Sequence, residues 1–187
     1  MSENLLLDTT MAEPSLTAGE AETLRFALDR SRAQFAWKAG GLDAAALRRP
    51  HPPSVMTLAG LVKHLAFVED LTTTRLTGRV PGAPWNAVDW EAEPGWDWRS
   101  AAADPPEDLY RLWRDAVARA RAAFDEVVAD GGLDRPASFW PHSGSEPDPN
   151  ARRLLVDLHD EYARHVGHAD LFREAVDGLV GEDPPQR

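Results

Sequence analysis

The chain has 187 residues, of which 43% are hydrophobic and 27% are charged. This length suits one domain of ordinary size, and the composition excludes wholesale disorder as well as collagen-like and repetitive classes. The formal net charge is -11, and no run of basic residues is long enough to form an anion-binding face. Because such a charge repels a phosphate backbone, we expect no nucleic-acid partner.

Two absences in the sequence narrow the chemistry and the location. Without cysteine the chain has no disulfide, no thiolate metal ligand and no cysteine nucleophile, so thiol chemistry would need a thiol from outside. No segment approaches the roughly 18 consecutive apolar residues of a membrane span, and the N-terminus lacks the basic region of a secretion signal. We therefore expect a cytoplasmic protein with no membrane partner.

Start and stop signals predict two long helices in the first half of the chain. The first is expected over residues 17–39, because Thr17 and Glu20 have capping-box spacing and two glycines follow Ala39. The second is expected over residues 57–77, where apolar residues recur at helical spacing up to Gly78.

Two more helices are predicted in the second half. The third opens at Asp104, which is expected to cap it, and ends at Gly131. The fourth follows Asn150, a second expected cap, and ends before Gly178. Four helices of similar length predict an all-α, up-and-down four-helix bundle with long loops.

The predicted bundle occupies residues 17–180, between a flexible N-terminal segment (1–16) and a flexible tail (181–187). The connections over residues 79–103 and 132–149 are long, and such loops usually cover or form a functional part of a domain. His142 in the later connection is expected to be an exposed loop residue.

Four tryptophans crowd the first of these connections: Trp85, Trp90, Trp96 and Trp98. They fit two interpretations. The loop is either a lid or pocket wall, since aromatic side chains line small-molecule sites, or a segment fastened to the bundle by its own rings.

Three ionisable residues of the fourth helix fall inside its apolar stripe on a helical wheel. Glu161, His165 and His168 lie on the side of the core residue Leu154, whereas His159 falls on the solvent side. An unpaired carboxylate on a core face costs several kcal/mol, so Glu161 needs a counter-charge, a proton or a metal ion. The alternative to a metal is a buried ion pair with an arginine.

A metal site also needs a ligand from another helix, and the second helix offers His64 at the margin of its apolar arc. Glu161 and His165 are four residues apart, about 6 Å along the helix axis, so both can lean toward one ion. His168 is one turn further and either binds the ion or supports a ligand from behind. Taken alone, His64 could equally be a boundary histidine with no metal.

The stretches at residues 57–65 (TLAGLVKHL) and 161–174 (EYARHVGHADLFRE) resemble the DinB/YfiT superfamily of metal-binding four-helix bundles. The resemblance covers residues 18–178 and is closer to the mycothiol-dependent branch, which includes maleylpyruvate isomerase and thiol S-transferases. It implies that His64, Glu161 and His165 are metal ligands and that the protein is a homodimer. Where many members carry Gln, this chain has His168.

Two histidines and one glutamate leave a further position open on the ion, as catalytic zinc sites do. The ligand set favours zinc, and nickel, manganese or iron would also fit. The resemblance implies a metal-dependent enzyme that activates a low-molecular-weight thiol of the mycothiol type for S-transfer to, or isomerisation of, a small electrophile. The alternatives are a metal-dependent hydrolase that uses bound water and a non-catalytic metal-binding or small-molecule-binding stress protein.

Overall fold

The structure is a computed structural model, and it describes residues 7–141 and 147–186. Within these ranges it contains helices and no strand, so the all-α class is confirmed. The expected exposure of His142 lies outside the described residues. The α-helices are α1 (Glu20–Ala39), α2 (Ala44–Leu47), α3 (Leu58–Thr77), α4 (Trp96–Ser100), α5 (Pro106–Ala129) and α6 (Ala151–Asp177).

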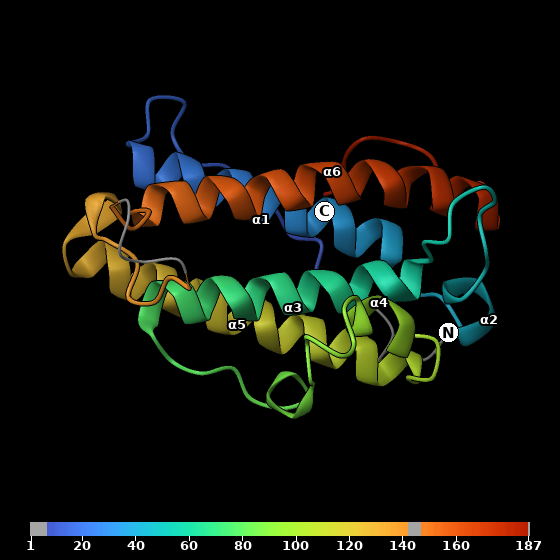
Figure 1. Cartoon of the computed structure of the whole chain (residues 1–187). Helices are drawn as coiled ribbons and strands as arrows, with labels where there is room; N and C mark the ends of the chain where they lie inside the picture. Colours follow the sequence, from blue (N-terminus) through green and yellow to red (C-terminus); the bar gives the residue numbers. More distant parts are fainter. Residues whose placement is uncertain (1–6, 142–146, 187) are drawn as a thin grey trace.

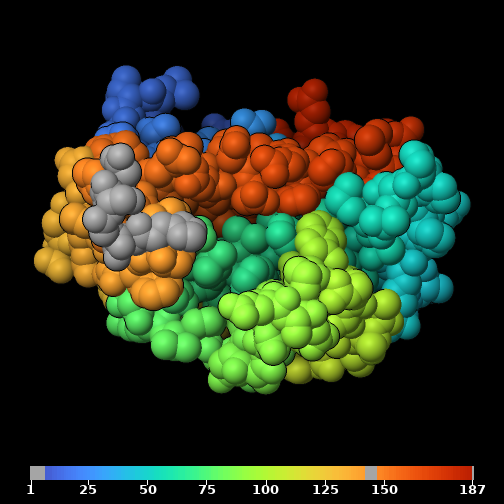
Figure 2. Space-filling model, viewed as in Figure 1, coloured from blue at the N-terminus to red at the C-terminus, as the bar shows by residue number. Residues whose placement is uncertain are grey.

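The four long helices α1, α3, α5 and α6 form the predicted bundle (Figure 1), in which α1 packs on α6 while α3 packs on both α5 and α6. The connection from α3 to α5 crosses back along the molecule, so these two helices run parallel (Figure 1). The expected up-and-down order is therefore wrong at this connection, although the all-α bundle is as expected, because a long crossover lets α5 start at the same end of the molecule as α3 (Figure 1). In the space-filling view the crossover covers much of the face that α3 and α5 present (Figure 2).

Two of the expected helix ends are formed as the sequence predicts. The side chain of Asn150 accepts a hydrogen bond of 3.0 Å from the backbone N–H of Arg153 at the start of α6. Helix α3 begins after Thr57 and ends at Gly78, whose φ of 72° lies in the left-handed region that glycine adopts without strain.

Two other predicted caps are wrong. Helix α1 begins after Gly19 with no side-chain cap, and the Thr17 hydroxyl pairs with Ser15 instead. The Asp104 carboxylate accepts from Lys63 Nζ at 2.5 Å rather than from the backbone of α5. Burying an ammonium without a partner costs several kcal/mol, whereas a cap contributes about 1 kcal/mol, so the ion pair prevails.

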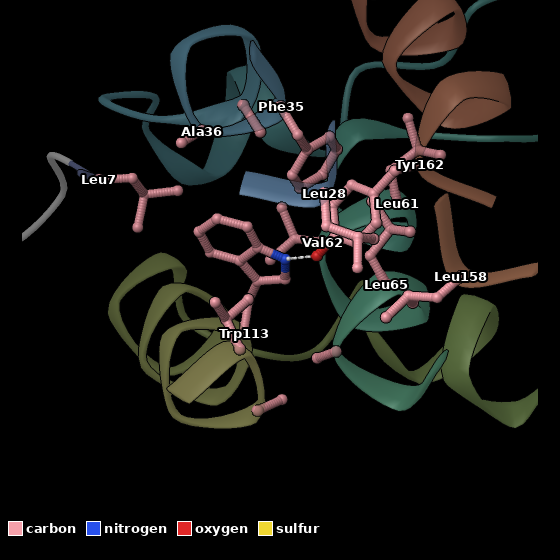
Figure 3. Packing of buried hydrophobic residues seen from close by; sticks show 14 of the residues in the cluster. Leu7, Leu28, Phe35, Ala36, Leu61, Val62, Leu65, Trp113, Leu158 and Tyr162 are labelled. Carbon is pink, nitrogen blue, oxygen red and sulfur yellow. Dashed lines mark hydrogen bonds between the residues drawn. The ribbon is translucent and has the colours of Figure 1, made fainter. Parts of the chain in front are cut away.

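One polar network inside the core joins all four long helices. Arg32 of α1 donates two hydrogen bonds, of 2.8 and 2.7 Å, to Glu69 of α3. Tyr162 of α6 donates to the same carboxylate at 2.7 Å and accepts from Trp113 Nε1 of α5 at 2.9 Å, a bond drawn in Figure 3. Around it pack Phe35, Leu61, Leu65 and other apolar side chains (Figure 3).

Three tryptophans fasten the crossover connection to the bundle. Trp85 is buried and donates from Nε1 to Asp70 of α3 at 2.7 Å. Trp90 and Trp96 pack against it, and Phe67 of α3 stacks on Trp90 with ring centroids 4.4 Å apart. For these three rings the geometry favours the fastened-loop interpretation.

None of the helices in the described ranges is long and apolar enough to cross a membrane.

Candidate metal centre

The structure brings His64, Glu161 and His165 together from two helices. One ligand atom from each lies within 4.8 Å of the others. Glu161 Oε2 is 3.6 Å from His64 Nε2 and 3.3 Å from His165 Nε2. Donor atoms about 2.1 Å from a tetrahedral zinc ion lie about 3.4 Å apart, so both spacings fit a shared ion. The antiparallel packing of α3 and α6 produces this cluster.

The second ring nitrogen of His64 has its own partner. His64 Nδ1 lies 2.8 Å from Asp97 Oδ2, and Asp97 is only 4% exposed. A carboxylate on Nδ1 holds the proton there and leaves the Nε2 lone pair free, as it does behind many metal-binding histidines. The pairing therefore favours the His64 tautomer with an unprotonated Nε2, which is the nitrogen that can bind a metal ion.

Asp97 belongs to α4, a short helix that begins after Gly95 in the left-handed conformation. The next residue, Trp98, stacks on the His64 ring with centroids 4.3 Å apart. A Cβ on Gly60 of α3 would lie 3.0 Å from the Trp98 ring, so glycine at this position permits the close approach of α4. Unlike the other three tryptophans of the connection, Trp98 forms part of the wall of the site.

His168 lies behind His165. Their Nδ1 atoms are 3.2 Å apart, and one must donate to the other. When His165 is the donor, its Nε2 faces Glu161 with a free lone pair. Burial, followed by the nearby His64, lowers the pKa of His165 to about 4, so the ring is neutral near pH 7. His168 therefore sits where it can orient His165.

Glu161 is less buried than its wheel position predicts. Its side chain is 32% exposed, because a groove between α3 and α6 opens beside it. Arg164 approaches Glu161 at 3.6 Å but is itself exposed. A buried arginine pair of the kind considered for Glu161 does exist in the core, but it joins Arg32 to Glu69.

The groove beside the cluster has a volume of about 440 Å³ and is lined by residues of α3 and α6, with His64 and Glu161 among them. Figure 2 shows a furrow between α6 and α3 on the face from which the molecule is viewed. The cluster is therefore accessible from one side, where a small molecule could meet an ion held by the three side chains.

Sequence reasoning named the three clustered residues and His168, but it did not single out Asp97 or assign Trp98 to the site. Asp97 stood among three other carboxylates of the same connection, Asp89, Glu91 and Glu93, with no periodic signal to separate them. The one distinguishing cue is the sequence Gly-Trp-Asp-Trp over residues 95–98, where a glycine precedes two aromatic residues that flank a carboxylate.

Four long helices with a His, Glu and His cluster between two of them define a bundle of the DinB/YfiT type. The model of the mycothiol-S-transferase family matches residues 23–178, most of the chain, and the chain belongs to that family.

A crystal structure of a conserved protein from Enterococcus faecalis has a similar fold, with a TM-score of 0.67 and 18% sequence identity. The match covers 87% of this chain and 100% of that one. No curated protein matches the chain.

Proposed function

We propose that the protein is a metal-dependent transferase that joins a low-molecular-weight thiol of the mycothiol type to a small electrophile. The observation that carries this proposal is the position of Glu161 Oε2 between two histidine Nε2 atoms at the edge of an open groove. Membership of the mycothiol-S-transferase family supports the choice of thiol. The absence of cysteine agrees with a thiol supplied from outside.

In this proposal His64, Glu161 and His165 hold one divalent ion, with zinc as the first choice. When bound, the ion supplies Lewis acidity, which lowers the pKa of a thiol that reaches its open position. Asp97 and His168 keep the two imidazoles turned toward Glu161. Trp98 excludes water from one side of the His64 ring.

The groove between α3 and α6 would hold the electrophile next to the sulfur. The sulfur forms a bond to the electrophilic carbon, and a leaving group departs with its bonding electron pair. The thiol proton passes to water in the open groove. Orientation of the two reactants is the main contribution of the protein to this step.

Turnover with and without thiol tests the proposal. Purified protein is mixed with mycothiol and 1-chloro-2,4-dinitrobenzene, and the thioether product is followed by absorbance. We expect product formation that requires both the thiol and the protein and that is lost after a chelator removes the metal. Metal-dependent hydrolysis of 4-nitrophenyl acetate, with no thiol-dependent turnover, would instead identify a hydrolase. Metal binding without either reaction would identify a binding protein.

A further inference from the structure

One positive side chain in the groove lacks an ion-pair partner. Three arginines line the groove. Arg153 pairs with Asp157 at 2.7 Å, and Arg164 approaches Glu161 at 3.6 Å. Within the described part of the chain Arg75 has no ion pair, and its Nε is buried without a hydrogen-bond partner. Its charge is therefore available to a ligand.

Both the backbone and the side chain of Arg75 make contacts that fix the position of this residue. Its backbone carbonyl accepts hydrogen bonds from the N–H groups of Ser138 (2.8 Å) and Phe139 (3.2 Å). Its guanidinium lies over the Trp140 ring, 4.8 Å from the centroid. Burial lowers the pKa of Arg75 while Asp157 opposes the shift, but a guanidinium stays charged at neutral pH. A partly desolvated charge in a fixed position is suited to binding an anion.

Arg75 lies at the opposite end of the groove from the metal cluster. It follows His64 by eleven residues on α3, which places the two on the same face about 16 Å apart along the helix axis. Between them the groove is lined by apolar side chains of both helices: Val68, Leu71, Leu154 and Leu158. A molecule that reaches both ends must be elongated, with an apolar middle and an acid group at one end.

We infer that Arg75 binds the acid group of an elongated organic anion whose other end reaches the metal cluster. That this anion is the electrophile of the S-transfer rests on the function proposed above. Two more carboxylates line the groove, but Asp157 is offset by Arg153 and Asp160 is exposed. Because the chain has a formal net charge of -11, an anion needs such a local positive group.

Binding of a matched acid and amide tests the inference without any reaction. Calorimetry measures the affinity of the full chain for 4-phenylbutyrate and for 4-phenylbutanamide, which differ in charge and little in shape. We expect the wild-type protein to bind the acid about tenfold to a hundredfold more tightly, as one charge-assisted contact allows. Arg75→Gln should bring the two affinities together, and Arg75→Lys should keep part of the difference.

Arg79→Gln is the matched control, because it removes the same charge from an exposed arginine that pairs with Glu126 outside the groove. It should leave the preference for the acid unchanged. The measurements are repeated after chelation, since a carboxylate could also bind the ion. A preference that persists in Arg75→Gln, or that disappears from the wild-type protein on chelation, would overturn the inference.

The transferase proposal and the Arg75 anion site can be contradicted independently of each other. 1-Chloro-2,4-dinitrobenzene carries no acid group, so thiol-dependent turnover with it tests the transferase without Arg75. A preference for the acid that depends on Arg75 would support the anion site even if this turnover were absent. Equal binding of acid and amide by the wild-type protein would remove the anion site and leave the transferase proposal standing.

Discussion

At His64 the two ring nitrogens meet different carboxylates, and this difference explains how one imidazole can serve as a ligand. Nδ1 is 2.8 Å from Asp97, whereas Nε2 faces Glu161 at 3.6 Å. The buried partner selects the tautomer, and the half-exposed partner shares the candidate ion. His165 also has a separate partner on each nitrogen, but its Nδ1 meets the imidazole of His168 instead of a carboxylate, while its Nε2 meets Glu161.

Asp97→Asn should weaken metal binding although all three candidate ligands remain. The amide oxygen can still accept from Nδ1, but the charge that fixes and polarises the His64 ring is lost. Removing such a partner typically lowers metal affinity about tenfold to a hundredfold. Competition with a chromophoric chelator measures the affinity, and Glu93→Gln, an exposed carboxylate of the same connection, is the control. Equal affinities in the two variants would contradict a supporting role for Asp97.

The candidate site was partly predictable because helical periodicity is a local property. It set Glu161, His165 and His168 on one side of α6 without knowledge of the fold. A wheel gives the direction of a side chain but not how far a neighbouring helix covers it, so the groove at Glu161 was missed. The place of Asp97 depends on how α4 packs against α3, and no spacing in the sequence encodes that.

At the scale of the helices, each of the four long helices contributes one residue to a buried polar network: Arg32, Glu69, Tyr162 and Trp113. Both charged side chains are almost inaccessible, at 6% for Arg32 and 0% for Glu69. Each group satisfies another, so the network favours one alignment of the four helices. A shift of α1 or α3 by one turn would separate Arg32 from Glu69, and a shift of α5 or α6 would break a hydrogen bond of the Tyr162 hydroxyl.

Glu69→Gln should destabilise the protein strongly. It removes the buried counter-charge of Arg32 and leaves only the more exposed Asp29, 2.9 Å from Nη1, to offset the guanidinium. Removing one partner of a buried ion pair typically costs about 3–5 kcal/mol, and the remaining contact with Asp29 places the expected loss toward the lower end. Urea denaturation followed by circular dichroism measures the free energy of unfolding. The double variant Arg32→Met/Glu69→Leu removes both charges and should be more stable than Glu69→Gln alone. A double variant less stable than the single one would contradict this account of the network.

Both tyrosines of the chain should resist ionisation until the helices unfold. Burial raises the pKa of Tyr110 to about 12, and burial followed by the Glu69 charge raises the pKa of Tyr162 well above its ordinary value. A tyrosine in the unfolded chain ionises near pH 10. Above that pH the unfolded state therefore loses protons that the folded state keeps, and stability falls as pH rises.

Ultraviolet absorbance during an alkaline titration checks this expectation. Tyrosinate should form together with the loss of helical circular dichroism. Ionisation of either tyrosine near pH 10 in a protein that is still helical would contradict it.

The boundaries of the helices show where local signals suffice. Asn150 caps the start of α6 and Gly78 ends α3, both as predicted. The carboxylate of Asp104 instead forms an ion pair with Lys63, a residue 41 positions away that is 3% exposed. Long-range partners of this kind are set by the fold and decide which of several plausible caps forms.

Over the whole molecule, the crossover connection between α3 and α5 has two roles. Its first three tryptophans fasten it to α3, and its end carries Asp97 and Trp98 to the cluster formed by α3 and α6. The bundle and its loop together form the candidate site. The homodimer implied by the family resemblance stays a prediction. Sedimentation equilibrium at micromolar concentrations would check it, and a strictly monomeric mass would contradict it.

The central claim is that His64, Glu161 and His165 bind one divalent ion, and metal analysis of two histidine variants tests it most directly. His165→Ala removes a candidate ligand, whereas His159→Ala removes a histidine of the same helix that lines a separate groove toward α1. Elemental analysis after purification in a zinc-supplemented buffer should find about one ion per chain in the wild-type protein and in His159→Ala. His165→Ala should retain only a small fraction of that amount. Equal metal content in the two variants would contradict the site and, with it, the proposed activation of a thiol.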